Sequence, residues 1–248
     1  MRDKNTGRVL GTVGIASYPV DHKNIAEAVF NEIADANLDN NIKVTHYLSR
    51  DGIRYKCSIL LKDYVMEPKV GDPAGLVLVF ETALTAVKAY RDHCEWLRYW
   101  CANGCASIDH HLSTRAKHTK NFDIDFLAGR FVNAPSYYME DEEKFKKMIE
   151  TSIERPEVEE LFSKTIANSP QRGKPDNVNQ KLLTTLMGNY DDEARQQGES
   201  LWSVYNAMTN WYTHHPMKKD ADFISTNSRR RNDVIKVMES DNWKRLAA

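Results

Sequence analysis

The chain has 248 residues, 41% of them hydrophobic and 28% charged, and this composition excludes a wholly disordered protein. The formal net charge is −1, so any function in nucleic-acid binding requires a basic surface that is local. The polar N-terminus lacks the apolar segment of a signal peptide, and no apolar run reaches the roughly 18 residues of a membrane span, so we expect a cytoplasmic protein without a membrane partner.

The N-terminal region is predicted to form a strand and then a helix. The strand is expected over Val9–Ala16, although two glycines inside it are typical of a bulge or of a close backbone approach. Asp21 is a suitable N-cap for a helix that runs to about Asn37. Apolar residues recur along this helix at helical spacing, which predicts one buried face: Ile25, Val29, Ile33 and Ala36.

A β-hairpin is the clearest local prediction. The segments Ile42–Leu48 and Ile53–Leu61 are rich in strand-forming residues, and Ser49 to Gly52 between them contains an Asp-Gly pair. A longer strand is expected over Leu76–Val87. A helix is then predicted from about Arg91 to Ala102, ending near an Asn-Gly pair.

Three of the four cysteines fall within or just after that last helix. Cys94, Cys101 and Cys105 would share one helical face. They could hold a metal or form a buried apolar stripe, and the absence of a CxxC pair favours the stripe.

The second half of the chain is expected to be helical. Helices are predicted over 140–167 with an interruption at Pro156, over 178–187, over 191–212 and over 228–246. The fold class is therefore α+β: an antiparallel sheet with helices on one side, in the order strand, helix, three strands, helix, followed by a mainly helical C-terminal half. We expect an α+β sheet domain over residues 1–135 and a helical extension packing on it over 136–248, with a possible hinge near 169–176.

Several short segments resemble a phage- and plasmid-borne family defined by a domain of unknown function, of the DUF932 type. They are Leu10–Gly14 with Tyr18, Trp100–Gly104, Arg115–Thr119, Ser200–Thr209, Arg229–Arg231 and Lys244–Ala247. The resemblance implies a mobile genetic element in a bacterial host cell, and it supplies no catalytic residue. The order of helix, three antiparallel strands and helix is also similar to the core of Rad52-like single-strand annealing proteins, which implies single-stranded DNA as a partner and a homo-oligomer.

Basic and aromatic residues form three segments that suit nucleic-acid binding, because phosphates attract cations and unpaired bases stack on aromatic rings. The alternative is that each segment is a solvated charged surface. A triple arginine at a helix start would oppose the helix dipole, which also indicates an anionic partner. If DNA binds, one basic groove is expected to join Arg54, Lys117 and Arg230. The predicted site residues are Arg50, Arg54, Tyr55, Lys56 and Lys62, then Arg115, Lys117, His118 and Lys120, then Arg229, Arg230 and Arg231.

Two other functions remain open. The segment Glu140–Glu160 has nine acids and four bases, which would suit an anti-defence protein that binds a host protein. A metal-dependent nuclease would use His110, His111 and His118 with nearby acids. No GxSxG, Walker A or GxGxxG motif occurs, so we expect a non-catalytic protein without a cofactor.

Overall fold

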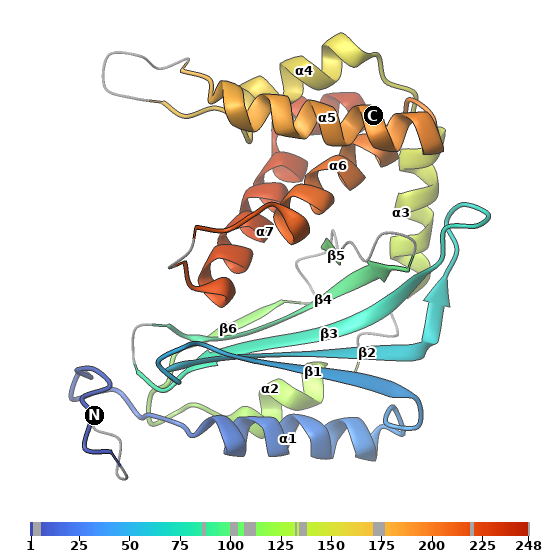
Figure 1. The fold of residues 1–248 in the computed structure, drawn as a ribbon. Coiled ribbons are helices and arrows are strands. Elements are labelled where there is room, and N and C mark those ends of the chain that lie inside the picture. Colours follow the sequence, from blue (N-terminus) through green and yellow to red (C-terminus); the bar gives the residue numbers. More distant parts are fainter. Residues whose placement is uncertain are drawn as a thin grey trace.

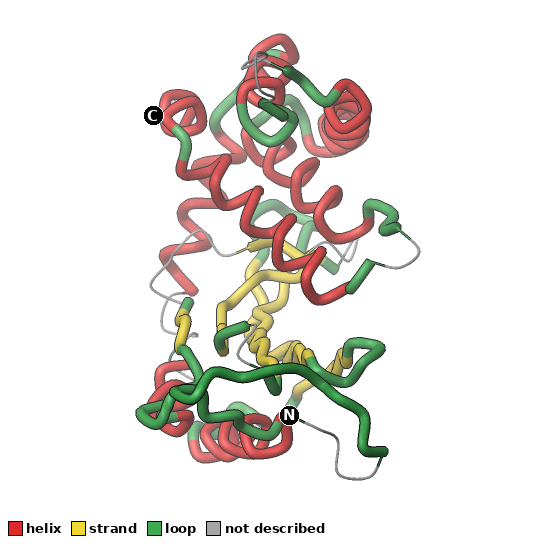
Figure 2. Tube along the Cα trace, turned by 90° about the vertical axis from the view of Figure 1, so that its left-hand side faces the viewer, coloured by secondary structure: helices red, strands yellow, loops and turns green. Residues whose placement is uncertain are grey.

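A twisted antiparallel sheet lies between two layers of helices (Figures 1 and 2). The computed structural model describes residues 1, 6–85, 88–99, 104–106, 113–131, 133, 138–170, 177–218 and 221–247. The sheet has six strands in the order β1-β2-β3-β4-β5, with β6 also paired to β4. The predicted α+β class and the mainly helical C-terminal half are confirmed.

The elements follow one another in a simple order. Helix α1 (His22–Asp35) is followed by the strands β1 (Ile42–Leu48), β2 (Arg54–Met66), β3 (Ala74–Ala83), β4 (Tyr90–Arg98), β5 (Gly104–Ala106) and β6 (Thr114–Ala116). The helices after the sheet are α2 (Ile124–Phe131), α3 (Tyr138–Glu150), α4 (Arg155–Lys164), α5 (Gln180–Gln197), α6 (Leu201–His214), α7 (Phe223–Glu239) and α8 (Asp241–Ala247). Helices α1 and α2 lie below the sheet in Figure 1, and α4 to α7 lie above it.

The first helix and the hairpin form as predicted. The side chain of Asp21 accepts a hydrogen bond from the backbone N–H of Lys23 at 3.0 Å and caps α1. In the β1–β2 turn, Gly52 has φ +74°, a left-handed conformation that suits glycine. β1 pairs antiparallel with β2, with Leu48 opposite Tyr55.

The two faces of the sheet differ in chemistry. The lower face is apolar and packs against α1 through residues that include Cys57, Ile59, Leu78, Phe80 and Cys94. The upper face, toward α7, buries charged and polar side chains, among them Lys56, Glu81 and His93. Its buried apolar residues form a separate small cluster of Leu60, Val77 and Val79. The C-terminal helices therefore cover a largely polar surface.

Two N-terminal predictions are wrong. Val9–Ala16 forms no strand: Val9 makes a single β-bridge, the rest of the segment is irregular, and Val9 and Ile15 are exposed. The segment from Arg91, predicted to be a helix, forms strand β4 instead. Its side chains alternate between the two faces of the sheet, and each face is covered by helices. Cys94 lies on β4 and Cys105 on β5, so these two cysteines share no helical face. Cys101 lies outside the described residues.

The C-terminal helix boundaries also differ from the prediction. Helix α5 continues through Asp191 and ends at Gln197. Gly198 has φ +91°, which is not a helical conformation, and α6 starts after Ser200. Pro156 lies in the first turn of α4, where its missing N–H leaves no helical hydrogen bond unmade. Helix α7 is capped by Asp222, so the arginine triplet lies in the middle of a helix rather than at its start.

A buried polar network connects the two halves of the chain. Arg98 of β4 contacts Asp72 of the β2–β3 loop and Glu193 of α5, and its guanidinium lies 5.5 Å from the ring centre of Trp202 on α6. The boundary near residue 135 stays a prediction, and 171–176 of the expected hinge lie outside the described residues.

Candidate nucleic-acid interface

Three residues of the predicted hairpin site have partners within the protein. Nη1 of Arg54 lies 2.8 Å from Asp222, and Nζ of Lys56 donates to Asn227 at 2.8 Å. The hydroxyl of Tyr55 is 2.7 Å from Nδ1 of His46, on the opposite face of the strand from Lys56. The contacts of Arg54 and Lys56 hold β2 against the start of α7, and that of Tyr55 joins β2 to β1, so all three side chains have a structural role.

The second basic segment is divided between surface and interior. Lys117 and Lys120 are exposed, as is Lys62 of the hairpin segment. His118 is buried, its Nε2 lies 3.2 Å from the hydroxyl of Thr82, and burial lowers its pKa. Arg54 and Arg230 line two different hollows, and Lys117 lines neither of them, so these two hollows are not the single groove expected from the sequence.

The arginine triplet points in three directions from α7. Arg229 is exposed. Arg230 is buried: it donates to the backbone carbonyls of His215 at 2.6 Å and Pro216 at 3.0 Å, beyond the end of α6, and it lies over the ring of Trp211. Arg231 is buried on the side of α7 that faces the sheet.

A groove between α5, α6 and α7 gathers positive charge from distant parts of the sequence. We call it the cationic groove. Its volume is about 800 Å³, and its floor includes Leu182, Trp211 and Met217. Among the described residues, four basic side chains and no acidic one line it: Lys181, Lys218, Arg229 and Arg230.

A second hollow adjoins the cationic groove at Ala221, which lines both. This hairpin hollow, of about 750 Å³, lies between the β1–β2 turn and the start of α7. Tyr47 and Phe223 stack in it with ring centres 4.9 Å apart, and Phe223 is 38% exposed. Its charged lining residues are Arg8, Arg50, Arg54, Asp51 and Asp222.

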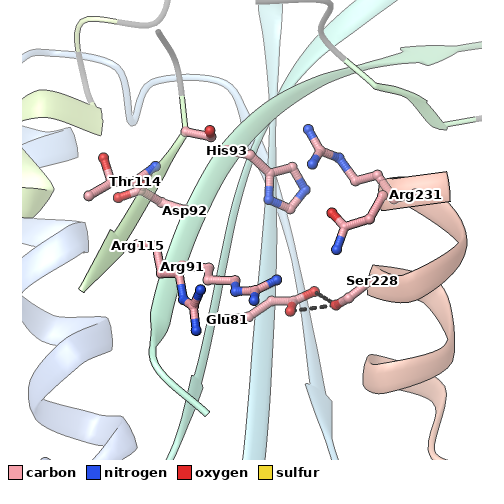
Figure 3. Close-up of a pocket in the computed structure, with 10 residues that line it drawn as sticks. Glu81, Arg91, Asp92, His93, Thr114, Arg115, Ser228 and Arg231 are labelled. Atoms are coloured by element: carbon pink, nitrogen blue, oxygen red, sulfur yellow. Dashed lines mark hydrogen bonds between the residues drawn. The ribbon is translucent and has the colours of Figure 1, made fainter. Parts of the chain in front are cut away.

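On the opposite side of α7 a smaller hollow, of about 220 Å³, opens above β3, β4 and β6 (Figure 3). We call it the arginine pocket, because Arg91, Arg115 and Arg231 all line it. Glu81 and Asp92 line it as well. Arg91 is not among the site residues predicted from the sequence, and its segment was expected to be a helix.

Beneath α7, His93 and Glu95 of β4 form a buried ionisable pair. Nε2 of His93 lies 3.8 Å from Oε2 of Glu95. Burial and the charge of Arg231 lower the pKa of His93 to about 4. Burial would raise the pKa of Glu95, but the contact with His93 and the charge of Lys56 outweigh it and hold that pKa low. At neutral pH the pocket therefore contains a neutral imidazole.

The described residues include no group of three or more His, Cys, Asp or Glu that could hold a metal. His110 and His111 of the nuclease hypothesis lie outside the described residues. Cys57 and Cys94 are buried thiols whose pKa values burial raises, to about 11 for Cys57. Such thiols pack as small apolar side chains and are poor nucleophiles.

The acidic segment is partly tied into the fold. Asp141 is buried and accepts a hydrogen bond from the indole of Trp96 at 2.8 Å. Glu142 pairs with Lys146, and Glu160 pairs with Lys164. These contacts engage part of the negative charge that the host-protein hypothesis would use.

Comparison with known families gives one match. The family model described as a domain of unknown function (DUF932) matches residues 20–235. The chain belongs to this family. No curated protein matches the sequence.

The part that matches the DUF932 family contains the whole sheet and nearly all of α7. Lys181, Lys218 and Arg229 of the cationic groove and the three arginines of the arginine pocket lie within it, whereas Arg8 of the hairpin hollow does not. None of the described helices combines the length and apolarity required to span a bilayer.

Proposed function

We propose that this DUF932 protein binds nucleic acid, and that the cationic groove holds the phosphate backbone. The observation that carries the proposal is the charge of the groove: of the residues that the structure describes, four basic ones and no acidic one line it, although the whole chain has a net charge of −1. Lys181, Lys218 and Arg229 are exposed and make no ion pair with any described residue. Cations free of carboxylate partners can release counterions from a phosphate backbone at low cost.

Single-stranded DNA is the form of nucleic acid that we propose. The cationic groove continues into the hairpin hollow at Ala221, where the exposed stack of Tyr47 and Phe223 offers an aromatic surface to an unpaired base. Arg8 and Arg50 line the same hollow. A cationic track that ends on an aromatic surface suits a single strand, since the bases of a duplex are already stacked on each other.

The finer features of the proposal rest on the resemblances found in the sequence. They are a non-catalytic annealing or recombination factor, a homo-oligomer, and a phage or plasmid gene product in the bacterial cytoplasm. Annealing of two complementary labelled strands, and the mass of the protein in solution with and without DNA, test the first two directly.

Fluorescence anisotropy with a labelled oligonucleotide that carries no terminal phosphate tests the binding itself. The test variant replaces Lys181, Lys218 and Arg229 with glutamine. Its control replaces three exposed cations elsewhere, Lys23, Arg195 and Lys236, so that both variants lose the same net charge.

We expect the groove variant to lose at least about tenfold in affinity and the control to lose much less. Single-stranded DNA should compete better than duplex of the same length. Absence of binding by the unmodified protein at low salt, or equal losses in the two variants, would refute the proposal.

A further inference from the structure

The arginine pocket is a site of a different kind from the cationic groove. It lies on the other side of α7, it is several times smaller, and strand residues form its floor (Figure 3). At about 220 Å³ it is below the roughly 300–1,000 Å³ of pockets for drug-sized ligands. It therefore suits a small group rather than a polymer.

Arg231 is the most informative residue of the pocket. It is 9% exposed, its Nε has no hydrogen-bond partner, and its guanidinium forms no direct ion pair with any residue that the structure describes, although its charge helps to lower the pKa of the buried Glu95 nearby. Burying a cation without a direct hydrogen-bonded carboxylate is costly, and proteins normally avoid it. Figure 3 shows Arg231 on α7 and His93 on β4 facing each other across the pocket.

Two more arginines extend the positive charge. Arg91 of β4 and Arg115 of β6 are direct partners in the strand register, and like charges at such positions repel each other. Within the described part of the chain neither guanidinium makes a hydrogen bond or an ion pair, and Arg91 is half-buried. The strands thus hold two cations together at a cost to the free protein.

The two acids of the pocket do not neutralise these cations by direct contact. Both carboxylate oxygens of Glu81 accept from the hydroxyl of Ser228, at 2.6 Å each. Asp92 accepts from the backbone N–H of Thr114 at 2.8 Å. Three arginines therefore line the pocket, and no described carboxylate contacts their guanidinium groups, so these donors can bind an incoming anion.

We propose that the arginine pocket binds the phosphate group of a phosphate monoester or of inorganic phosphate. A monoester carries about −1.5 to −2 charges at pH 7 and three acceptor oxygens, which fit several guanidinium groups, since arginine forms paired hydrogen bonds to phosphate. Thr114 and Ser228 add hydroxyl groups to the lining. The neutral imidazole of His93 adds no charge that would compete for the arginines.

Isothermal titration calorimetry with the full chain tests the pocket. The probes are inorganic phosphate, a nucleoside 5′-monophosphate, and one oligonucleotide made with either a 5′-phosphate or a 5′-hydroxyl. The variants are Arg91→Gln and Arg115→Gln, singly and together. Arg229→Gln is the control, because it removes an exposed arginine that lies on the other side of α7 from the pocket.

We expect saturable binding of inorganic phosphate or the monophosphate to the unmodified protein and to Arg229→Gln, and a loss of at least about tenfold in each pocket variant. If only inorganic phosphate binds, the source is the free ion. If the monophosphate binds more tightly, the source is a nucleotide, and a 5′-phosphate preference of the oligonucleotide identifies a strand end.

Each proposal can fail without the other. The pocket variants should still bind the 5′-hydroxyl oligonucleotide, and the groove variant should still bind phosphate. The inference is overturned if neither phosphate probe binds, or if Arg91→Gln and Arg115→Gln, shown to be folded by circular dichroism, bind phosphate as Arg229→Gln does.

Discussion

Arg98 and Asp72 form a two-point ion pair in the interior, with Nε 2.8 Å from Oδ1 and Nη2 2.7 Å from Oδ2. Both side chains are almost wholly buried. Glu193 accepts from the same guanidinium at 3.1 Å, and the indole of Trp202 is 3.4 Å from Asp72. One arginine of the sheet thereby fixes a loop and two helices of the C-terminal half.

Replacing Arg98 with methionine should destabilise the protein strongly. The substitution leaves the carboxylates of Asp72 and Glu193 buried without their cation, and the loss of one partner of a buried pair costs about 3–5 kcal/mol. Urea denaturation followed by circular dichroism measures it. Arg155→Met is the control, because the Arg155–Asp191 pair is exposed, and it should change the midpoint little. Similar midpoints for the two variants would contradict the role given to Arg98.

The sequence predicted local structure well where one signal dominated. Asp21 and the apolar spacing after it located α1, and the Asp-Gly pair located the hairpin. Strand β4 was mistaken for a helix because both of its faces are buried, one on α1 and the other under α7. Cys94 and Trp96 face one side and His93 and Glu95 the other, and both pairs are largely buried. The alternation of exposed and buried residues that marks an ordinary strand is therefore absent from this sequence.

The candidate sites were harder to predict because they join residues that are distant in the sequence. Lys181 and Arg229 meet only after α5 and α7 pack around α6. Residues that were predicted to form one site because they are adjacent in the sequence point in different directions: Arg230 caps α6, while Arg231 faces the sheet. Only the tertiary fold shows which of these cations have partners.

Arg230→Met should lower stability rather than act on nucleic-acid binding alone. It removes the donors that satisfy the carbonyls of His215 and Pro216 beyond the end of α6, and because these hydrogen bonds are part-buried the expected loss is about 0.5–1.5 kcal/mol. Arg229→Met, which changes an exposed side chain, should leave the urea midpoint almost unchanged. Equal midpoints would show that Arg230 has no capping role.

The salt dependence of DNA binding should reveal how many groove cations contact phosphate. Single strands give a slope of log K against log salt of about −0.7 per neutralised phosphate. The variant with Lys181, Lys218 and Arg229 replaced by glutamine should therefore have a slope about 2 units less steep than the unmodified protein. Anisotropy titrations over a range of salt concentrations supply the slopes, and an unchanged slope would mean that these residues do not contact the backbone.

Stability should fall as the pH falls from about 6.5 toward 4. The pKa of His93 is lowered to about 4 in the folded protein, so in this window the unfolded chain binds a proton that the folded chain does not. The effect is on the order of 1–3 kcal/mol. His93→Gln should flatten the profile of unfolding free energy against pH, whereas His214→Gln, at an exposed position, should not.

Arg115→Gln should leave the free protein as stable as before or slightly more stable. Arg115 is directly opposite Arg91 across the strands, and removing one of two like charges relieves a repulsion worth roughly 0.2–1 kcal/mol. Thermal melts without phosphate measure this change, and low salt makes it larger. A clear loss of stability would show that Arg115 has a structural partner.

The polar contacts between the sheet and α7 join segments that lie far apart in the chain. Arg54 meets Asp222 across 168 positions, Lys56 meets Asn227 across 171, and Glu81 meets Ser228 across 147. During synthesis on the ribosome, the strands are therefore made long before the helix that covers their charged face. The upper face of the sheet is therefore exposed to water until α7 has been synthesised. Because this face has charged side chains, it promotes aggregation of the nascent chain less than an apolar face would.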